Sequence, residues 1–334
     1  LYTTYKRFLP HINNGYDFAE MASELLGELN VSHTGCRYHA PSSSLPVAQL
    51  GIIPDETYQG EGIRVAEVLS GGPLDVCKVI KAGSIITSID GMKIEACADY
   101  YPMLAGKAGK ATRLSIKGEK KEIVVRPISW GKQEELLYKR WVRRNEHMVD
   151  SLSGGRLAYV HIEAMNAASF HEFYKNLLSE KNRMRDAVIV DTRHNGGGWL
   201  HNDVCIALSG KAYSRFTPRG KFIGNDPFDR WVKPSCMLVC EDNYSNAHGT
   251  PWLYKEMGIG KLIGAPVPGT MTAVWWENIG QYTFGIPQVG TKDNRGNYLE
   301  NQQLEPDIEC YVTPEDMLRG VDTQIQAAVK ELMK

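Results

Sequence analysis

The feature that most constrains the fold is an apolar run at 187–190, Ala-Val-Ile-Val, which a polar and glycine-rich segment follows at once. An unbroken run of this length suits a strand that is buried on both faces of a parallel sheet. A strand is expected before it at 157–162. A helix is expected between the two, because one helical face collects Phe170, Phe173, Tyr174, Leu177 and Leu178. This order predicts an α/β domain.

The pattern repeats toward the C-terminus. Strands are expected at 236–240 and 261–263, with a helix from about Thr250 to Met257 between them and Gly258 as its stop. Thr313 and Pro314 are expected to open a last helix. The region 129–334 is therefore predicted to form an α/β sandwich.

The block at 48–128 has a different texture, with short β-branched runs separated by tight turns such as Asp90-Gly91. This block resembles a PDZ domain in two places. An expected short helix follows Gly72-Pro73-Leu74, and the next strand follows Lys81-Ala82-Gly83. The resemblance implies binding of extended peptides by strand addition. A small β-barrel that serves only as a spacer is the alternative. The polar stretch at 131–150 is expected to link this block to the last domain.

Residues 1–47 are expected to form a helical part. Asp17 is expected to cap a helix, with Glu20 three residues later as in a capping box, and the helix should end near Asn30. A loop with the sequence Val-Ser-His-Thr-Gly follows at 31–35. The predicted fold class is thus mixed α/β and β, in three parts: 1–47, 48–128 and 129–334.

Composition excludes several classes of partner. The net charge is -1 without a block of like charge, which argues against nucleic acid and an acidic membrane surface. No apolar stretch approaches the roughly 18 residues that a spanning helix needs, so no membrane insertion is expected. The seven cysteines include no pair at zinc spacing, and no metal or cofactor is expected. Cys236 and Cys240 are interpreted as buried thiols, and the cysteine usage favours a cytoplasmic location over an exported form, which stays open.

Two turns that follow predicted strands could build an active site, because ligands of open α/β sheets bind beyond the carboxyl ends of the strands. The first contains Gly196, Gly197 and Gly198, whose backbone can turn N–H groups toward a developing oxyanion. Phosphate binding is the rival, but no Lys-Ser or Lys-Thr pair follows as a phosphate loop requires. The second turn, 242–249, lies where hydrolases carry their nucleophile, and Ser245 is the only serine in it.

Three segments taken together resemble the tricorn-type serine peptidases. The segment at 29–35 resembles the one that carries the catalytic histidine, with a serine just before it. The turn from Asn195 to Gly198 resembles the glycine turn of the oxyanion hole, and Glu300-Asn301 resembles the segment of the catalytic glutamate. The resemblance spans nearly the whole chain and implies a ClpP/crotonase-like catalytic domain. It also implies β-propellers upstream; since the sequence begins with Leu1 and not with Met, we expect a fragment or a mature form of a longer protein.

The resemblance implies a Ser-Ser-His-Glu tetrad. His33 becomes the general base, and Ser32 and Glu300 become the groups that orient it. The N–H groups of Gly197 and His248 are expected to hold the oxyanion. The family's nucleophile turn reads Ser-x-Ser, and alignment of this turn places Ala247 at the attacking position.

Because alanine carries no nucleophile, the chain as written is expected to be nearly inactive. The methyl group preserves the turn while removing one oxygen, which favours an engineered Ser→Ala replacement over a natural loss. Two alternatives stay open: Ser245 attacks instead, or the chain is a peptide-binding pseudoenzyme. The related C-terminal processing peptidases use a Ser–Lys dyad, which the absence of lysine from 262–291 disfavours. A purely structural α/β protein explains the combination of motifs poorly.

The expected reaction is hydrolysis of peptides or unfolded polypeptides through an acyl-enzyme. Candidate substrate contacts are Gly196, Gly198, Ser245 and Arg215. With Lys211 and Arg219, Arg215 would form a basic rim for an acidic or carboxyl-terminal group; a solvated charged face is the alternative. Trp275-Trp276 would either line a peptide cleft or pack in a core. The side-chain preference and the formation of a homo-oligomer are left open.

Overall fold

The computed structural model describes residues 1–41 and 44–334. The chain divides into two compact units, one made of residues 1–40 and 145–334 and the other of residues 41–144. Within the described part of the chain, no helix combines the length and the apolar character that crossing a bilayer requires.

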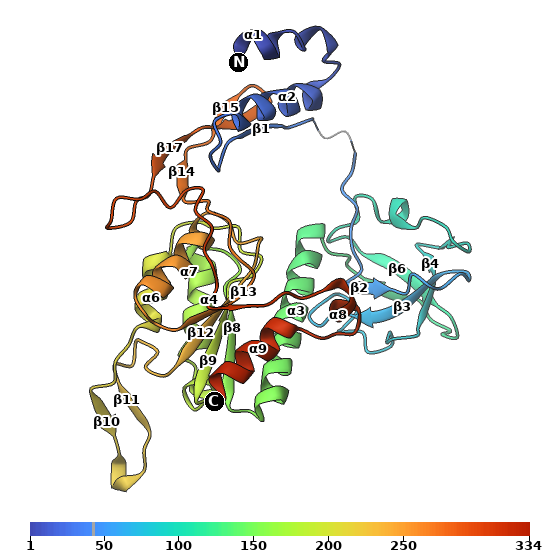
Figure 1. The fold of residues 1–334 in the computed structure, drawn as a ribbon. Helices are drawn as coiled ribbons and strands as arrows, with labels where there is room; N and C mark the ends of the chain where they lie inside the picture. The colour runs from blue at the N-terminus through green and yellow to red at the C-terminus, as the bar shows by residue number, and fades with distance from the viewer. Residues whose placement is uncertain (42–43) are drawn as a thin grey trace. The chain divides into compact units, whose positions relative to one another are not determined.

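The first unit is built on a five-stranded parallel sheet in the order β18-β13-β12-β9-β8 (Figure 1). The strands are β8 (Leu157–His161), β9 (Ala187–Asp191), β12 (Ser235–Val239), β13 (Lys261–Gly264) and β18 (Ile308–Glu309). Every residue of β9 and β12 is buried, as an apolar run inside a parallel sheet requires. The predicted α/β fold class is confirmed.

Helices cover both faces of this sheet. Val188 and Val190 of β9 share one core with Phe173 of α4 (Ala167–Leu177), and α6 (His201–Leu208) and α7 (Asn246–Glu256) belong to the same core. Strand residues between them point to the other face, where α9 (Thr323–Leu332) packs on β9, β12 and β13 (Figure 1). Two short helices, α5 (Glu180–Arg183) and α8 (Pro314–Leu318), also belong to this unit. Thr313 caps α8 as expected, but α8 is not the last helix, because α9 follows it.

The N-terminal segment contains α1 (Tyr2–Lys6), a 3-10 turn at Leu9–His11, α2 (Gly15–Gly27) and β1 (Gly35–Tyr38). The expected cap of α2 was wrong: the side chain of Asn14 accepts the backbone N–H of Asp17 at 3.0 Å. Asn14 is extended and precedes the helix, whereas Asp17 already lies in the first turn, so the helix begins and ends about three residues earlier than expected.

β1 joins this N-terminal segment to the C-terminal half of the chain. It pairs antiparallel with β16 (Tyr282–Gly285), which also pairs with β15 (Glu277–Ile279). β14 (Thr272–Val274) pairs with β17 (Pro287–Gly290) close by in the chain. A separate hairpin consists of β10 (Ser214–Phe216) and β11 (Gly224–Asp226), with a 3-10 turn at Pro218–Gly220 between them.

The second unit is an antiparallel sheet in the order β2-β3-β4-β6-β7 with β5 beside β4. Its strands are β2 (Ile52–Pro54), β3 (Ile63–Val68), β4 (Ile85–Ile89), β5 (Met92–Lys93), β6 (Thr112–Ile116) and β7 (Ile123–Val125), with a 3-10 turn at Tyr101–Leu104. Val65, Ile86 and Leu114 are buried in a core of its own. The short helix expected after Leu74 is absent from this described unit, and turns run through that segment instead.

The polar stretch at 131–150 was predicted to be a link and is instead most of a 24-residue helix, α3 (Trp130–Ser153). Leu136 and Val149 are buried while charged residues occupy the exposed positions, and Lys139 pairs with Glu135 one turn away. The high charge of the stretch hid this one-sided apolar pattern.

Candidate active site

The carboxyl ends of β9 and β12 bring the two predicted turns together. The backbone N–H of Tyr244 donates to the carbonyl of Asn195 at 3.1 Å. Gly197 has a φ of 97°, and a Cβ on it would lie 2.6 Å from Cβ of Ser245. Only glycine fits here, because both the backbone conformation and the available space exclude a side chain.

The second turn enters α7 four residues earlier than the expected start at Thr250. Ala247 and His248 therefore lie in the first helical turn, and both are buried. The buried amide of Asn243 holds the turn: Nδ2 donates to the Ala247 carbonyl at 3.1 Å and to the Thr192 carbonyl at 3.0 Å. Ser245 immediately precedes the helix with φ 57° and ψ -124°, a strained conformation for a residue with a side chain.

Ser32, His33 and Glu300 are brought together although they come from opposite ends of the chain. Oγ of Ser32 lies 2.9 Å from Nδ1 of His33 and donates to Oε2 of Glu300 at 3.0 Å. The other carboxylate oxygen of Glu300 accepts the backbone N–H of Ser32 at 2.5 Å. This order, carboxylate to hydroxyl to Nδ1, leaves Nε2 of the imidazole as the nitrogen for a substrate-side proton.

Two residues of this cluster were missed by the sequence analysis. Oγ1 of Thr272, on β14, lies 2.8 Å from Oγ of Ser32 and 3.0 Å from Nδ1 of His33. The hydroxyl of Tyr244 accepts the backbone N–H of His33 at 2.7 Å, and the two rings lie 4.8 Å apart between centroids. Tyr244 thereby joins the histidine loop to the turn that carries Ala247. The alternation of Thr270 and Thr272 beside Gly269 was the only sequence signal for a hydroxyl contributed by this strand.

The two expected oxyanion donors lie in the two packed turns, with Gly197 against Ser245 and His248 next to Ala247 in the chain, but both are engaged within the protein. The N–H of Gly197 donates to Oδ1 of Asn195 at 2.8 Å, and the N–H of His248 donates to the carbonyl of Ser245 at 2.8 Å. Gly196 and Gly198 are exposed on either side of Gly197. An oxyanion would have to compete with these two internal acceptors.

Burial shapes the titration of both histidines of the site. Burial lowers the pKa of His33, while the negative charge of Glu300 partly offsets this effect by raising the pKa. Burial lowers the pKa of His248 further, to about 4. Nδ1 of His248 is buried and, among the residues that the structure describes, meets no hydrogen-bond partner. Both imidazoles are therefore neutral at pH 7, as a general base must be.

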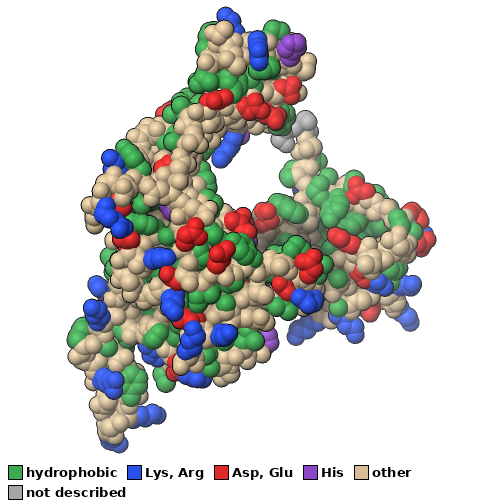
Figure 2. All heavy atoms as spheres, viewed as in Figure 1, with side chains coloured by type: hydrophobic (Ala, Val, Ile, Leu, Met, Phe, Trp, Pro, Cys, Tyr) green, Lys and Arg blue, Asp and Glu red, His purple; other side chains and the backbone are tan. Residues whose placement is uncertain are grey.

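A cleft of about 490 Å³ lies beside Ser32 and Glu300, and neither His33 nor Ala247 is among the described residues that line it. Ser32, Tyr244 and Glu300 line it, together with the strand-connecting segment at 268–270. The structure does not bring Arg215 to this cleft, because hairpin β10–β11 projects from the other end of the unit (Figure 1). Basic side chains gather along this hairpin (Figure 2). Trp275 is exposed, and Trp276 packs under the guanidinium of Arg37.

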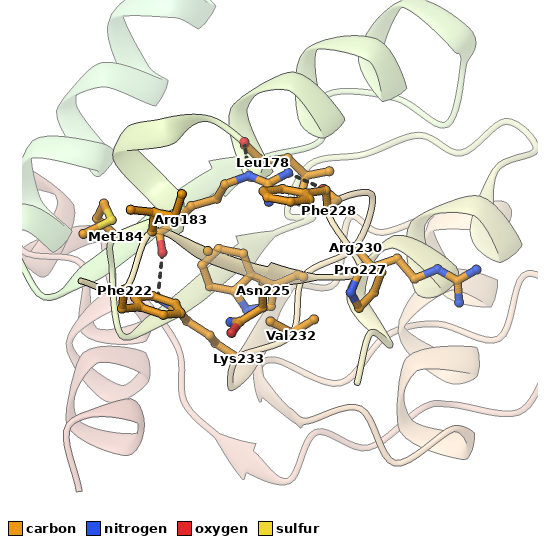
Figure 3. A pocket seen from close by; sticks show the side chains of 13 residues that line it. Leu178, Arg183, Met184, Phe222, Asn225, Pro227, Phe228, Arg230, Val232 and Lys233 are labelled. Atoms are coloured by element: carbon orange, nitrogen blue, oxygen red, sulfur yellow. Dashed lines mark hydrogen bonds between the residues drawn. The ribbon is translucent and has the colours of Figure 1, made fainter. Parts of the chain in front are cut away.

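A second hollow lies at the base of this hairpin (Figure 3). Two of its three cations serve the fold: Nε of Arg183 donates to the Leu178 carbonyl at 2.6 Å, and Nζ of Lys233 donates to the Arg183 carbonyl at 2.7 Å. Arg183 also lies over the ring of Phe228. Apolar side chains make up most of the remaining wall, so the hollow offers an anion little unengaged charge.

Comparison with known proteins supplies an independent line of evidence. Residues 156–310 match peptidase family S41, and residues 57–129 match the tricorn protease PDZ domain. The tricorn protease of Thermoplasma acidophilum is 25% identical over 350 residues, which cover 100% of this chain and 32% of that protein. A tricorn protease homolog of Saccharolobus solfataricus is 26% identical over 99% of this chain and 32% of that protein.

A crystal structure of the tricorn protease superposes with a TM-score of 0.87 at 24% identity, over 100% of this chain and 34% of that chain. This likeness establishes the fold. The chain spans about a third of the length of these relatives.

Proposed function

This chain belongs to the tricorn-type peptidases of family S41, and from that premise we propose that its site carries out serine-type hydrolysis of peptide bonds. The observation that supports the proposal most strongly is the hydrogen-bonded series Glu300–Ser32–His33, with Oγ of Ser32 at 3.0 Å from the carboxylate and 2.9 Å from Nδ1. A histidine held at Nδ1 in this way is oriented to act as a base through Nε2.

The proposed reaction requires a serine at position 247. His33 would take the hydroxyl proton as Oγ attacks the peptide carbonyl, and would return it to the leaving amine. Water, deprotonated by the same imidazole, would then release the acyl group. The N–H groups of Gly197 and His248 would hold the oxyanion after exchanging their present acceptors for it.

With Ala247 in place, this chain is proposed to bind peptides without cleaving them. We favour an alanine that replaces a catalytic serine, because its buried position in the first turn of α7 retains the support of Asn243. Peptide capture by an inactive relative of the peptidases is the second candidate, and the cleft of about 490 Å³ favours it. Peptide substrates, assembly into oligomers and the activity of any longer protein remain parts of this proposal.

Ser245 is the competing nucleophile, and its strained φ of 57° beside Gly197 favours keeping it under test. Hydrolases hold their nucleophile in such a strained strand-to-helix turn. Positions 245 and 247 cannot both present a hydroxyl group to the same oxyanion donors, so only one of the two residues can be the nucleophile.

The test is Ala247→Ser, assayed on a pool of unstructured fluorogenic peptides. We expect turnover to rise by about a million-fold from the alanine form, the usual cost of losing such a nucleophile. Adding Ser245→Ala should leave this activity within tenfold if position 247 attacks. A correctly folded serine form that cleaves nothing, while it binds the peptides by fluorescence anisotropy, would leave the capture function alone standing.

A further inference from the structure

Three side chains with metal-binding atoms meet beyond the carboxyl ends of β9 and β12. They are His194, Cys240 and Asp242, whose ligand atoms all lie within 4.8 Å of one another. Nδ1 of His194 lies 2.8 Å from Oδ2 of Asp242, and the backbone N–H of His194 donates to Sγ of Cys240 at 3.3 Å. None of these side chains takes part in the mechanism proposed above.

The donor set is that of a zinc-type ion. Imidazole nitrogen, thiolate sulfur and carboxylate oxygen are the three ligands that zinc takes in proteins, and three protein ligands leave a fourth position for water. In a tetrahedral site with ordinary bond lengths, ligand atoms lie about 3.3–3.8 Å apart. Separations of 2.8 Å and at most 4.8 Å therefore need shifts of about 1 Å or less.

The surroundings allow these shifts at the two outer ligands and fix the inner one. The side chains of His194 and Asp242 are 56% and 63% exposed, so an ion can reach them from solvent. Cys240 is 5% exposed, and Oδ1 of Asn243 accepts its backbone N–H at 2.9 Å and its thiol at 3.3 Å. The backbone N–H of His194 already points at the sulfur, as donors to metal-bound thiolates do.

We propose that His194, Cys240 and Asp242 bind one divalent transition-metal ion of zinc type. On binding, the thiol of Cys240 transfers its proton to solvent and the Sγ–metal bond forms. Nδ1 of His194 and one oxygen of Asp242 exchange their mutual hydrogen bond for bonds to the ion. Asn243 loses the thiol donor and keeps the backbone N–H of Cys240.

Such an ion would connect the two turns of the active site. His194 lies three residues before Gly197 in the glycine turn, and Asp242 lies five residues before Ala247. A bond from each turn to one ion would add to the hydrogen bonds that already join the two turns, such as those from Tyr244 to Asn195 and from Asn243 to Thr192. The role assigned is structural, and it does not depend on peptidase activity.

Cobalt(II) provides the test because thiolate ligation gives a near-ultraviolet charge-transfer band and tetrahedral geometry gives intense visible bands. The full chain, treated with chelator and kept reduced, is titrated with Co²⁺ and then with Zn²⁺ as competitor. We expect one equivalent to bind, Zn²⁺ to displace it, and Zn²⁺ to raise Tm. Cys240→Ser should abolish the charge-transfer band, and His194→Ala and Asp242→Asn should each weaken binding by about tenfold or more.

Two cysteine variants serve as controls. Cys97→Ser removes an exposed thiol and Cys236→Ser removes a buried one on β12, the strand that Cys240 follows, and both should keep the band. If Cys240→Ser fails to fold, the two exposed-ligand variants still decide the matter. Two results would overturn the proposal: a titration that gives no stoichiometric band, or a band that survives in His194→Ala and Asp242→Asn. Either result would show an ordinary His–Asp pair beside a buried thiol.

Discussion

Two hydroxyl oxygens lie near Nδ1 of His33, one from the adjacent residue and one from a distant part of the chain. Ser32 is its neighbour, whereas Thr272 lies 239 residues away and Glu300 contacts Ser32 across 268 residues. Because Oγ of Ser32 donates its hydrogen to Glu300, Nδ1–H of His33 is the donor toward Ser32, and Oγ1 of Thr272 offers a second acceptor for the same N–H. The tautomer of His33 is therefore set by a small network rather than by one bond.

Glu300→Gln, in a chain carrying Ala247→Ser, is predicted to lower kcat/KM by about 10²–10⁴ through loss of the orienting charge. It should also move the acid limb of the pH–rate profile to lower pH. Glu300 raises the pKa of His33, so its removal lets burial depress that pKa further. Glu305→Gln, at an exposed carboxylate nearby, is the control and should change neither quantity. An unchanged acid limb would contradict the role given to Glu300.

His248 is predicted to make the fold sensitive to acid. Its pKa is about 4 in the folded chain and about 6.5 when unfolded, so the unfolded state binds more protons between these values. Stability should therefore fall by about 2–3 kcal/mol as the pH drops from 7 to 4. His248→Gln should remove this part of the dependence, measured by urea unfolding at several pH values. His171→Gln, at an exposed histidine, should leave it unchanged.

Site residues that lie in recognisable sequence motifs could be predicted, whereas residues that reach the site only through tertiary contacts could not. Ser32, His33 and Glu300 stand in segments whose order resembles the family, and the structure places them together. Thr272 and Tyr244 have no motif; they enter through the pairing of β14 and through the strained turn before α7. Arg215 shows the converse, because a basic residue without a motif lies on a hairpin away from the cleft.

At the scale of elements, the glycine turn and the entry to α7 act as a single packed piece. Gly197→Ala is predicted to destabilise the chain by about 2–4 kcal/mol, since a positive φ and a contact of 2.6 Å with Ser245 add strain and overpacking. It should also inactivate the Ala247→Ser form. Gly196→Ala is the matched control, because a Cβ there meets open space, and it should cost less than about 1 kcal/mol. Equal costs in urea unfolding would refute the packing argument.

Element boundaries were predicted least well where charge or capping competed with periodicity. The buried strands β9 and β12 follow from continuous apolar runs. α3 was missed because its many charged residues were interpreted as a polar link, although one face of the helix is buried. α7 begins at Asn246 rather than near Thr250 because the N–H groups of Ala247 and His248 already donate to the carbonyls of Tyr244 and Ser245, a contact that no local sequence pattern indicates.

For the whole molecule, two separate hydrophobic cores imply two unfolding events. Val190 belongs to the core of the α/β unit and Ile86 to that of the β-rich unit. Ile86→Ala should lower one calorimetric transition by about 2–5 kcal/mol, and Val190→Ala should lower the other by about 1–3 kcal/mol. A single transition that both variants shift equally would show that the units unfold together. The sequence analysis had expected three parts, 1–47, 48–128 and 129–334, because a change from β-rich runs to alternating strands and helices indicates a change of core.

The pairing of β1 with β16, and of Ser32 with Glu300, also sets an order of events during synthesis. The histidine loop leaves the ribosome well before the carboxylate that completes its surroundings, because Glu300 follows Ser32 by 268 residues. A nascent polypeptide that has not yet reached Glu300 consequently holds the imidazole beside Ser32 without the carboxylate that completes the series.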